Sequence, residues 1–545
     1  MPNRWYRNAV IYSLDVGTFQ DSNADGFGDL PGLISRLDYL SRLGVTAVWL
    51  NPIHPSPRHD GGYDVADHYN IDPRFGNLGD FAELLNQADE RGLRILLDLA
   101  VNHTSDQHPW FQAARADPAS PFRDWYVWSE REPAERWDGG VFPDVEPESW
   151  SYDERAQAWY RHRFYRFEPD LNTSHPQVRA EIRKIAAFWL RLGVSGFRID
   201  AAPFLIENRN PGQTYRRPDY QFLRELRDTL SWRKGDAVLL AEANVEDGDL
   251  LEYFGQADGS ASRLLMLFAF RLNQAIMLAL ARQNAAPIRH ILRALPDLPA
   301  HAQWATFLRN HDEVDLGRLS PEERQDVFTA FGPDPDMQAY QRGIRRRLAP
   351  MLGGDQRRLR MAYSLLFTLP GTPVIRYGDE IGMGEDLALP ERAAIRTPMQ
   401  WSSMPTAGFS DSDQPSVPPI RTGPYSLDRV NVTDQRRDPD SLLMWHERML
   451  HTLRECEEIG TGEHETIGTG PPAVLVHRVT APSGAMLFLH NLAPQPCRIA
   501  ARVPPDPDEQ PLNIAADTDY GTAIDLEALD LEGYGYRWIR LRRTP

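Results

Sequence analysis

Residues 196–200 read GFRID, a short apolar run that ends in an acid. The same arrangement recurs in RILLDLAVNH at 94–103, VLLAEAN at 238–244 and WATFLRNHD at 304–312. Longer segments with helical periodicity separate these runs, which is the pattern of parallel strands joined by crossover helices. Eight such runs predict an α/β fold of the (β/α)8 TIM barrel type. The predicted strands are 10–14, 45–50, 94–100, 196–200, 238–243, 264–270, 304–310 and 372–377.

The spacing between the runs is unequal, and this predicts insertions in the barrel. Residues 103–168, after the third strand, form an aromatic and acidic stretch that is too long for a barrel loop, so we expect a small inserted domain there. A second excursion, at about 320–358, lies between the seventh and eighth strands. The predicted catalytic barrel therefore comprises residues 1–102 and 169–438.

The pattern changes after residue 438, which predicts a separate C-terminal domain at 439–545. A helix at 442–456 comes first, followed by short strands that Gly- and Pro-rich turns separate. Such strands predict an antiparallel β-sandwich. They are expected at 473–479, 486–492 and 536–541.

The composition argues against several kinds of partner. The chain has 545 residues and a formal net charge of −18 at pH 7, and such an acidic surface repels nucleic acids and anionic membranes. Cys456 and Cys497 are too few for a disulfide framework. Residues 1–10 lack the apolar run of a signal peptide, so we expect a cytoplasmic protein. The sequence leaves the oligomeric state open, a homo-oligomer included.

Acids close the predicted strands four, five and seven at Asp200, Glu242 and Asp312. Catalytic side chains of such barrels lie at the carboxyl ends of the strands, so these acids are expected to gather around one axis. Cleaving a glycosidic bond with retention requires two carboxyl groups about 5 to 5.5 Å apart. A single acid at a strand end is often only a helix cap or an ion-pair partner, but several together favour catalysis.

The neighbours of these acids suit the same chemistry. Arg198 lies two residues before Asp200, so both side chains point to one side of the strand and the guanidinium keeps the carboxylate ionised. Glu242 must carry a proton at neutral pH, and crowding with other carboxylates raises its pKa in that direction. Side chains suited to contact a sugar, by hydrogen bonding or by stacking, are His103, His311 and Tyr63.

These motifs resemble the conserved regions of glycoside hydrolase family 13, the α-amylase superfamily, over residues 8–440. The resemblance implies that Asp200 is the nucleophile, Glu242 the acid/base and Asp312 the transition-state stabiliser. Arg396, in RTPMQW, resembles an arginine that closes the pocket around a terminal glucose. The resemblance also places four residues in the subsite of the reacting sugar: Asp64, His103, Arg198 and His311.

Within the family, three segments are similar to trehalose synthases, which isomerise maltose to trehalose. They are NHTSDQHPWF at 102–111, GIRRRLAP at 343–350 and YGDEIGMG at 377–384. By spacing alone, the arginines at 345–347 would form a basic helical turn that faces solvent. Two departures, Arg376 in place of an aromatic residue and SLDVG at 13–17, are expected near the rim of the pocket.

The implied mechanism leaves the product open. Asp200 attacks the anomeric carbon of an α-linked glucose while Glu242 protonates the departing oxygen. If the pocket keeps the released glucose and excludes water, that glucose attacks and trehalose forms; if water enters, hydrolysis results. The alternatives to an isomerase are an α-glucosidase or transglucosidase acting on maltose, sucrose or a short oligosaccharide, and a catalytically silent sugar-binding scaffold.

Residues 21–29, DSNADGFGD, supply oxygen ligands at alternate positions, as a loop that binds a hard cation does. An EF-hand is excluded because Gly32 stands where the twelfth-position Glu is required. The loop resembles the calcium loop of oligo-1,6-glucosidases, and a solvated acidic turn is the alternative. The implied ligands are the side chains of Asp21, Asn23, Asp25 and Asp29 and the carbonyl of Phe27.

A second calcium site is implied by analogy with trehalose synthases. Asn102 and Asp170 could equally form a hydrogen-bonded pair that anchors the inserted domain to the barrel. The candidate ligands of the second site are Asn102, Asp170 and Glu207, with carbonyls near Phe204 and Leu205.

Overall fold

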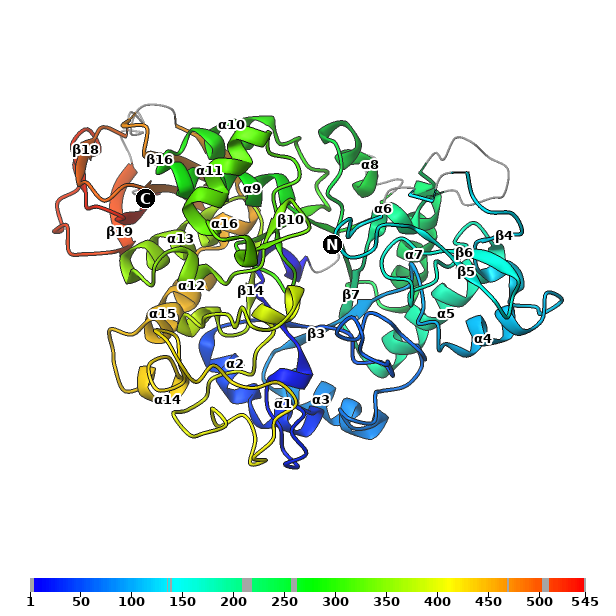
Figure 1. The fold of residues 1–545 in the computed structure, drawn as a ribbon. Helices are drawn as coiled ribbons and strands as arrows, with labels where there is room; N and C mark the ends of the chain where they lie inside the picture. Colours follow the sequence, from blue (N-terminus) through cyan, green and yellow to red (C-terminus); the bar gives the residue numbers. More distant parts are fainter. Residues whose placement is uncertain are drawn as a thin grey trace.

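A closed barrel of eight parallel strands forms the centre of the molecule (Figure 1). The computed structural model describes residues 4–134, 136–137, 140–207, 218–255, 262–467, 470–501 and 509–543. The predicted (β/α)8 barrel is confirmed. Its strands are β1 (Ile11–Leu14), β2 (Ala47–Leu50), β3 (Arg94–Leu99), β7 (Gly196–Ile199), β8 (Val238–Ala241), β9 (Met266–Phe268), β10 (Gln303–Phe307) and β14 (Thr372–Arg376).

Every predicted strand overlaps an observed one, but most end earlier than expected. Asp200 and Glu242 follow the last paired residues of β7 and β8, Ile199 and Ala241, and so lie outside the ladder. Their backbone N–H groups still donate to Leu99 and Ile199, at 3.3 Å each. The side chains of Asp200 and Glu242, just beyond the ladder, line a cavity at this edge of the barrel.

The barrel interior changes from apolar to polar along the strands. Alternate strand residues point inward, and in the lower layers they form an apolar cluster that includes Trp49, Leu96, Phe307 and Val374. One inward step further on, the buried side chains are polar or charged. These are Ser13 on β1, Asp98 on β3, Arg198 on β7, Arg309 after β10 and Arg376 on β14.

Helices cover the outside of the barrel. α5, for example, begins at the His175 cap, ends at Gly193 and buries the stripe Val178, Ile182, Ile185 and Trp189 against the strands. The outer helices are α1 (Leu30–Ser35), α2 (Leu37–Leu43), α3 (Leu78–Glu90), α5 (Pro176–Leu192), α7 (Tyr220–Arg233), α8 (Leu250–Phe254), α9 (Phe270–Arg282), α10 (Ala286–Ala294) and α13 (Gln356–Thr368).

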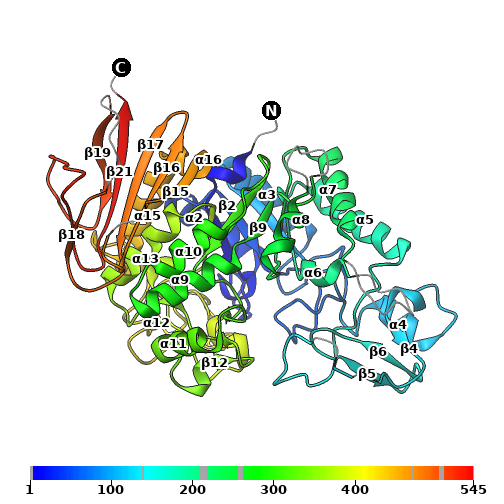
Figure 2. The same cartoon turned by 90° about the horizontal axis from the view of Figure 1, so that it is seen from above.

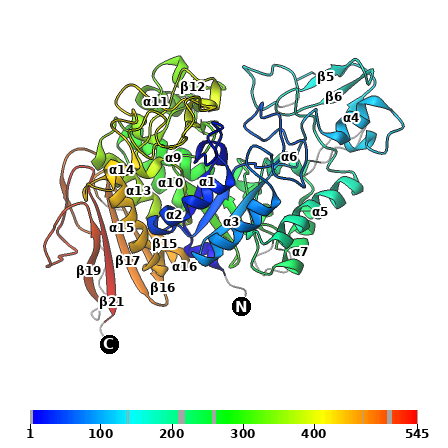
Figure 3. The same cartoon turned by 90° about the horizontal axis from the view of Figure 1, so that it is seen from below.

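Two insertions lie at the same end of the barrel, opposite the N-terminus (Figures 2 and 3). The first, between β3 and β7, contains a three-stranded sheet with the order β4-β6-β5, and the second, between β10 and β14, contains a sheet with the order β11-β13-β12. Their elements are α4 (Pro109–Ala116), β4 (Trp128–Ser129), β5 (Trp150–Asp153) and β6 (Ala158–Arg161), then β11 (Val314–Asp315), α11 (Pro321–Phe331), β12 (Gln338–Ala339), β13 (Gly343–Ile344) and α12 (Leu348–Met351).

The C-terminal region forms the predicted antiparallel β-sandwich, on the far side of the barrel from the first insertion (Figure 2). Ile499 and Leu529 of the small sheet pack on Leu487 and Ile539 of the large one. The other face of the large sheet packs on the barrel, where the Trp538 indole donates to Ser364 Oγ of α13 at 2.9 Å. The large sheet comprises β15 (Glu463–Thr466), β16 (Val474–Ala481), β17 (Gly484–Asn491), β21 (Tyr536–Arg543) and β19 (Glu509–Ala516). The small sheet comprises β18 (Cys497–Ile499) and β20 (Leu529–Leu531). Before the sheets come the helices α14 (Val432–Gln435), α15 (Leu442–Arg454) and α16 (Glu457–Thr461).

Among the helices of the described ranges, none combines the length and the apolar character needed to cross a lipid bilayer.

Candidate active site

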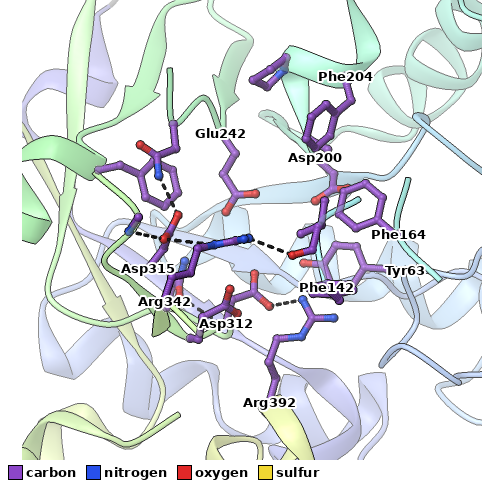
Figure 4. Close-up of a pocket in the computed structure, with 18 of the residues that line it drawn as sticks. Tyr63, Phe142, Phe164, Asp200, Phe204, Glu242, Asp312, Asp315, Arg342 and Arg392 are labelled. Atoms are coloured by element: carbon purple, nitrogen blue, oxygen red, sulfur yellow. Dashed lines mark hydrogen bonds and ion pairs between the residues drawn. The ribbon is translucent and has the colours of Figure 1, made fainter. Parts of the chain in front are cut away.

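The three acids at the strand ends meet in one cavity of about 440 Å³ (Figure 4). Asp200 follows β7, Glu242 follows β8 and Asp312 lies in the loop after β10. The arrangement therefore brings together the carboxylates that sequence reasoning assigned to catalysis. The wall also contains Asp60, Tyr63, His103, Phe142, Phe164, Phe204, Asn244, Glu313, Asp315, Arg342 and Arg392.

A single guanidinium group joins the nucleophile and acid/base candidates. Arg198 Nη1 donates to Asp200 Oδ1 at 2.7 Å and to Asp98 Oδ1 at 2.8 Å, while its Nη2 is paired with Glu242. Arg198 is fully buried, so its charge acts in a medium of low dielectric constant. Two carboxyl groups held at neighbouring nitrogens of one guanidinium are close enough for the short separation of a retaining pair.

The surroundings of Glu242 suit a proton donor. Burial raises the pKa of its carboxyl group to about 7, since the neighbouring charges of Asp200 and Asp312 act in the same direction and Arg198 opposes them only in part. A carboxylic acid with this pKa is still partly protonated at neutral pH, as a general acid must be.

Asp312 has the opposite environment. Its carboxylate receives His311 Nε2 at 3.0 Å, Arg392 Nη1 at 2.8 Å and Arg396 Nη2 at 2.9 Å. Burial alone would raise the pKa of Asp312, but His311 and the two arginines lower it well below its usual value. Asp312 is therefore an anion that can accept hydrogen bonds or stabilise positive charge.

An ion pair closes one end of the cavity. Arg392 Nη2 donates to Asp60 Oδ1 at 2.6 Å, so its guanidinium spans the gap between Asp60 and Asp312. Beyond this pair lies a second cavity of about 710 Å³, and Asp60 and Arg392 are the wall residues common to both. The catalytic cavity therefore ends at a charged wall rather than continuing as an open cleft.

The two insertions form a roof over the cavity. Phe142 of the first insertion lies against Tyr340 of the second with ring centroids 4.6 Å apart, and the Arg392 guanidinium lies 4.8 Å from the Phe142 ring. Arg342 Nη2 donates to the Val141 carbonyl at 3.0 Å. Figure 4 shows Phe142 and Arg342 beside the catalytic acids.

One carboxylate ties the two sides of this roof together. Glu391 Oε2 accepts the Tyr165 hydroxyl at 2.6 Å from the first insertion and the Tyr340 hydroxyl at 2.7 Å from the second. Glu391 and Tyr340 both have a left-handed backbone, with φ of 42° and 54°. Such conformations cost about 1–3 kcal/mol each in non-glycine residues and occur where the surrounding contacts require them.

The remaining predicted sugar contacts lie at two depths. Tyr63 and His103 line the cavity, whereas Arg198, His311 and Arg396 lie behind its wall and hold the acids. Asp64 is fully buried and does not line the cavity; it accepts the Ser56 hydroxyl at 2.7 Å and the His59 N–H at 2.9 Å. Its observed role is to shape the loop that presents Asp60.

Sequence reasoning missed Asp60, Phe142, Glu313, Arg342 and Arg392. Arg392 lies four residues before Arg396, and Glu313 directly follows Asp312, so proximity to known motifs was a usable signal for these two. Phe142 and Arg342 lie in the insertions, where no strand end marks them.

The prediction that the arginines at 345–347 form a turn facing solvent is wrong for two of them. Arg345 and Arg347 are buried. Arg345 donates to the carbonyls of Asp336, Leu387 and Leu389, and Arg347 donates to those of Tyr377 and Ile395. The segment therefore fastens the second insertion to the loop that carries Arg392 and Arg396.

Ser13 and Arg376 also differ from expectation. They are paired in register on β1 and β14, are fully buried, and do not line the catalytic cavity. The prediction that these departures lie at the pocket rim is therefore wrong for Ser13 and Arg376, whose side chains point into the barrel, whereas Asp15 and Gly17 of the same segment line the neighbouring cavity.

The loop at 21–29 gathers the oxygen-bearing side chains that a hard cation prefers, and each of them accepts hydrogen bonds within the protein. The side chains of Asp21, Asn23 and Asp25 each accept the backbone N–H two residues ahead, at 2.8 to 3.0 Å. No ion pair joins Asp21, Asp25 or Asp29 to a cation in the described part of the chain. That part also holds no cluster of three His, Cys, Asp or Glu side chains placed for a metal, so a calcium ion here requires the Asn23 amide and the Phe27 carbonyl as ligands.

The residues of the second calcium site do not fit a metal ion. Arg163 Nη2 lies 2.6 Å from Glu207 Oε2, and Arg161 lies 3.8 Å from Asp170 and 3.7 Å from Glu207. Two guanidinium groups thus already balance the two carboxylates. The Asn102 carbonyl accepts the Leu171 N–H at 3.0 Å, which ties the first insertion to β3 through the backbone.

Comparison with known proteins agrees with this geometry. The family model described as "Alpha amylase, catalytic domain" matches residues 15–326 and 345–462. Trehalose synthase/amylase TreS of Mycobacterium tuberculosis is 39% identical over 98% of this chain and 90% of its own length. Trehalose synthase of Thermus thermophilus is 44% identical over 82% of this chain and 46% of its own length.

Solved structures give the same result. The α-amylase from H. orenii superposes with a TM-score of 0.77 at 27% identity, covering 98% of this chain and 99% of that one. The α-glucosyl transfer enzyme XgtA superposes with a TM-score of 0.78 at 28% identity, covering 99% of this chain and 100% of that one.

The raised pKa of Glu242 predicts where activity falls on the alkaline side of the pH profile. Because the acid must be protonated to assist the leaving group, kcat/KM on an aryl α-glucoside with a poor leaving group should fall above about pH 7, tenfold per pH unit. Glu242→Gln should remove most of this activity but spare attack on a dinitrophenyl α-glucoside, whose leaving group needs no proton. An alkaline limb near pH 4–5 would contradict the assignment.

Proposed function

This chain belongs to the α-amylase family of enzymes acting on α-glucosides, and on that premise we propose that it isomerises maltose to trehalose by intramolecular transfer. The observation that carries the proposal is a complete catalytic set in one cavity that the two insertions partly cover. Asp200, Glu242 and Asp312 share one cavity whose end is an ion pair and whose roof joins two insertions.

Bond breaking follows from the positions of the two acids. An oxygen of Asp200 attacks the anomeric carbon of the non-reducing glucose, and the bond from that carbon to the glycosidic oxygen breaks. Glu242 delivers its proton to the departing oxygen, which leaves as a hydroxyl of free glucose. The products are a β-glucosyl ester on Asp200, a Glu242 carboxylate and a glucose molecule still inside the cavity.

In the second half of the reaction, Glu242 acts as the base and Asp200 is the leaving group. Glu242, now a base, takes the proton from the anomeric hydroxyl of the released glucose, whose oxygen attacks the glucosyl carbon and expels Asp200. Two inversions restore the α configuration and give an α,α-1,1 linkage. The Asp312 anion supports both steps, because the transition state carries positive charge on the sugar ring.

The roof favours isomerisation over hydrolysis. Released glucose must turn within the cavity before it attacks, and water competes for the same intermediate during that time. Contacts of Phe142, Tyr340 and Arg342 narrow the cavity between the two insertions, which supports retention of the glucose over its exchange with water. The alternative is an α-glucosidase, which uses the same acids in a more accessible cavity. Such an enzyme would give glucose rather than trehalose in the test.

A silent sugar-binding scaffold is disfavoured. Such a protein has no need of a partly protonated acid beside an ionised one, yet Glu242 and Asp312 have opposite protonation environments in one cavity. We also propose calcium at residues 21–29 as a structural ion and a cytoplasmic location. The first is supported by the oxygen donors of the loop, and the second by Cys456 and Cys497, which are not bridged.

Incubation of the protein with maltose alone tests the reaction. Chromatography should show trehalose as the main product, with a smaller amount of glucose. Asp200→Asn should lower turnover by about 10⁴-fold or more, because the covalent intermediate cannot form. Glucose without trehalose would show that the protein is a hydrolase and not an isomerase. Full turnover in Asp200→Asn would reject the mechanism.

Loosening the roof should shift the product ratio. Each tyrosine hydroxyl bound to Glu391 contributes about 1.5–3 kcal/mol as a hydrogen bond to a charged acceptor. The double variant Tyr165→Phe/Tyr340→Phe should therefore release a larger share of glucose relative to trehalose from maltose. Tyr152→Phe, a half-exposed tyrosine of the same insertion, is the matched control. An unchanged ratio in the double variant would show that this junction does not control water access.

Calcium removal should lower thermal stability without changing the fold. A chelator is expected to reduce the melting temperature by roughly 2–5 °C, and added Ca²⁺ should restore it. Asp25→Ala should abolish this response, whereas Asp89→Ala on the exposed face of α3 should preserve it. If the chelator leaves the melting temperature unchanged, the loop is only a solvated turn.

A further inference from the structure

Three histidines form a row on the face of the C-terminal sheet that packs on the barrel. His464 lies on β15, His477 on β16 and His490 on β17, and the proposed reaction uses none of them. The rings are stacked, with centroids 6.4 Å apart between His464 and His477 and 6.0 Å apart between His477 and His490. We call these three residues the histidine row. His477 and His490 are at most 1% exposed, so the row lies inside the junction between the sandwich and the barrel.

Each member of the histidine row contacts a helix through its Nε2 atom. The partners are the Ile459 carbonyl of α16 for His464 at 3.0 Å, Thr368 Oγ1 of α13 for His477 at 3.3 Å and Ser364 Oγ of α13 for His490 at 3.0 Å. Because a carbonyl oxygen only accepts hydrogen bonds, the proton of neutral His464 lies on Nε2. The row therefore ties the sheet to α13 and α16 through hydrogen bonds that neutral rings make.

The opposite nitrogen of each ring has no such contact. Nδ1 of His464, His477 and His490 is buried and has no hydrogen-bond partner among the described residues. A second proton on His464 must go to Nδ1, where its N–H would find no acceptor. In the described ranges no carboxylate lies within ion-pair distance of the row, and the charges that act on His477 are those of His464 and His490. Protonation would therefore bury an unbalanced charge beside like charges.

The helices packed against the histidine row supply no free carboxylate. The sequences of α10 and α13 contain no acidic residue. Glu447 of α15 is paired with two arginines, at 3.0 and 2.8 Å, and Glu458 of α16 is paired with Arg540 at 3.0 Å. Glu457 of α16 is exposed to solvent. The negative charges of these helices are thus already balanced or point away from the junction.

The other charged groups near the row oppose its protonation or lie on the far face of the sheet. Glu463 and Glu465 flank His464 on β15, and since side chains alternate along a strand, both point away from the barrel. On the packed elements, the titratable groups at the junction include Tyr363 and Arg360 on α13, His446 on α15, Arg540 on β21, and Arg289 and Arg293 on α10. The positive charges among them disfavour a further cation in the row.

The junction keeps the histidine row neutral. Burial lowers the pKa of His464 to about 4 and that of His490 to about 3, and burial together with the two neighbouring rings lowers the pKa of His477 well below its usual value. A histidine in water titrates near about pH 6.5. Below that pH, a sheet separated from the barrel binds protons that the docked sheet excludes. The junction therefore keeps its full stability above about pH 6.5 and loses it as the pH falls from there toward about 4.

We infer that the histidine row is an acid-sensitive joint, which holds the C-terminal sandwich on the barrel at neutral pH and releases it in mild acid. Each histidine that gains a proton on release raises the equilibrium constant for release about tenfold per pH unit within this window. Three histidines therefore give a response of up to about a thousandfold per pH unit. The catalytic acids are not part of the joint, so the inference does not rest on the proposed isomerisation.

Hydrogen exchange of the unchanged full chain tests the joint directly. After correction for the intrinsic pH dependence of exchange, peptides from α13, β16 and β17 should lose protection between about pH 7.5 and about pH 5. Peptides from α5 and α7, on the opposite side of the barrel (Figure 2), should keep theirs. Equal loss of protection in α5 and α7, or none in α13, would overturn the proposal.

Substitution of His477 separates the row from other buried histidines, such as His54 and His68 in the barrel. His477→Gln keeps an N–H donor for Thr368 but cannot gain a proton. Its loss of α13 protection at pH 5 should therefore be roughly 30-fold smaller than in the unchanged protein, the effect of one proton over about 1.5 pH units. His290→Gln, at an exposed position of α10, is the matched control and should behave like the unchanged protein. The same pH dependence in His477→Gln as in the unchanged protein would show that the row does not drive release.

Discussion

The catalytic centre depends on one buried guanidinium group, that of Arg198. Its two terminal nitrogens hold Asp98, Asp200 and Glu242, so a single positive charge organises three acids at the mouth of the barrel. Without it, burial and mutual repulsion would raise the pKa values of Asp98 and Glu242 still further. With it, Asp200 is held in place by a hydrogen bond while Glu242 keeps a raised pKa, so a proton donor lies beside the group that attacks.

The barrel supplies the acids, and the insertions supply the enclosure. Asp312 owes its strongly lowered pKa to His311 and to arginines on the loop after β14, and that loop is fastened by Arg345 and Arg347. Glu391 on the same loop joins the two insertions through tyrosine hydroxyls. One segment of chain therefore sets the charge of the stabilising anion and the closure of the cavity. This coupling explains how an isomerase and a hydrolase can share the same acids and differ in product.

Charge balance distinguishes the two sides of the inner barrel. Around Arg198 acids outnumber cations, whereas around Arg376 cations outnumber acids. The first imbalance is useful for catalysis, because it tunes proton affinity. The second has no such use in the reaction, and it leaves donors of Ser13 and Arg376 without a hydrogen-bond partner among the described residues.

The sequence alone determined the barrel, because strands that are covered on both faces are read as apolar runs, and it placed Asp200 and Glu242 at the strand ends where catalysis occurs. The tertiary structure decided which residues far apart in the chain contact one another, and the periodicity of the sequence does not encode these contacts. Arg392 and Phe142 act through contacts with residues that are far away in the chain, and Arg345 and Arg347 are buried because another loop covers them. Ser13 and Arg376 point into the barrel because parallel pairing sets their register. Local patterns report which face of an element is apolar, whereas partners across the fold depend on the path of the whole chain.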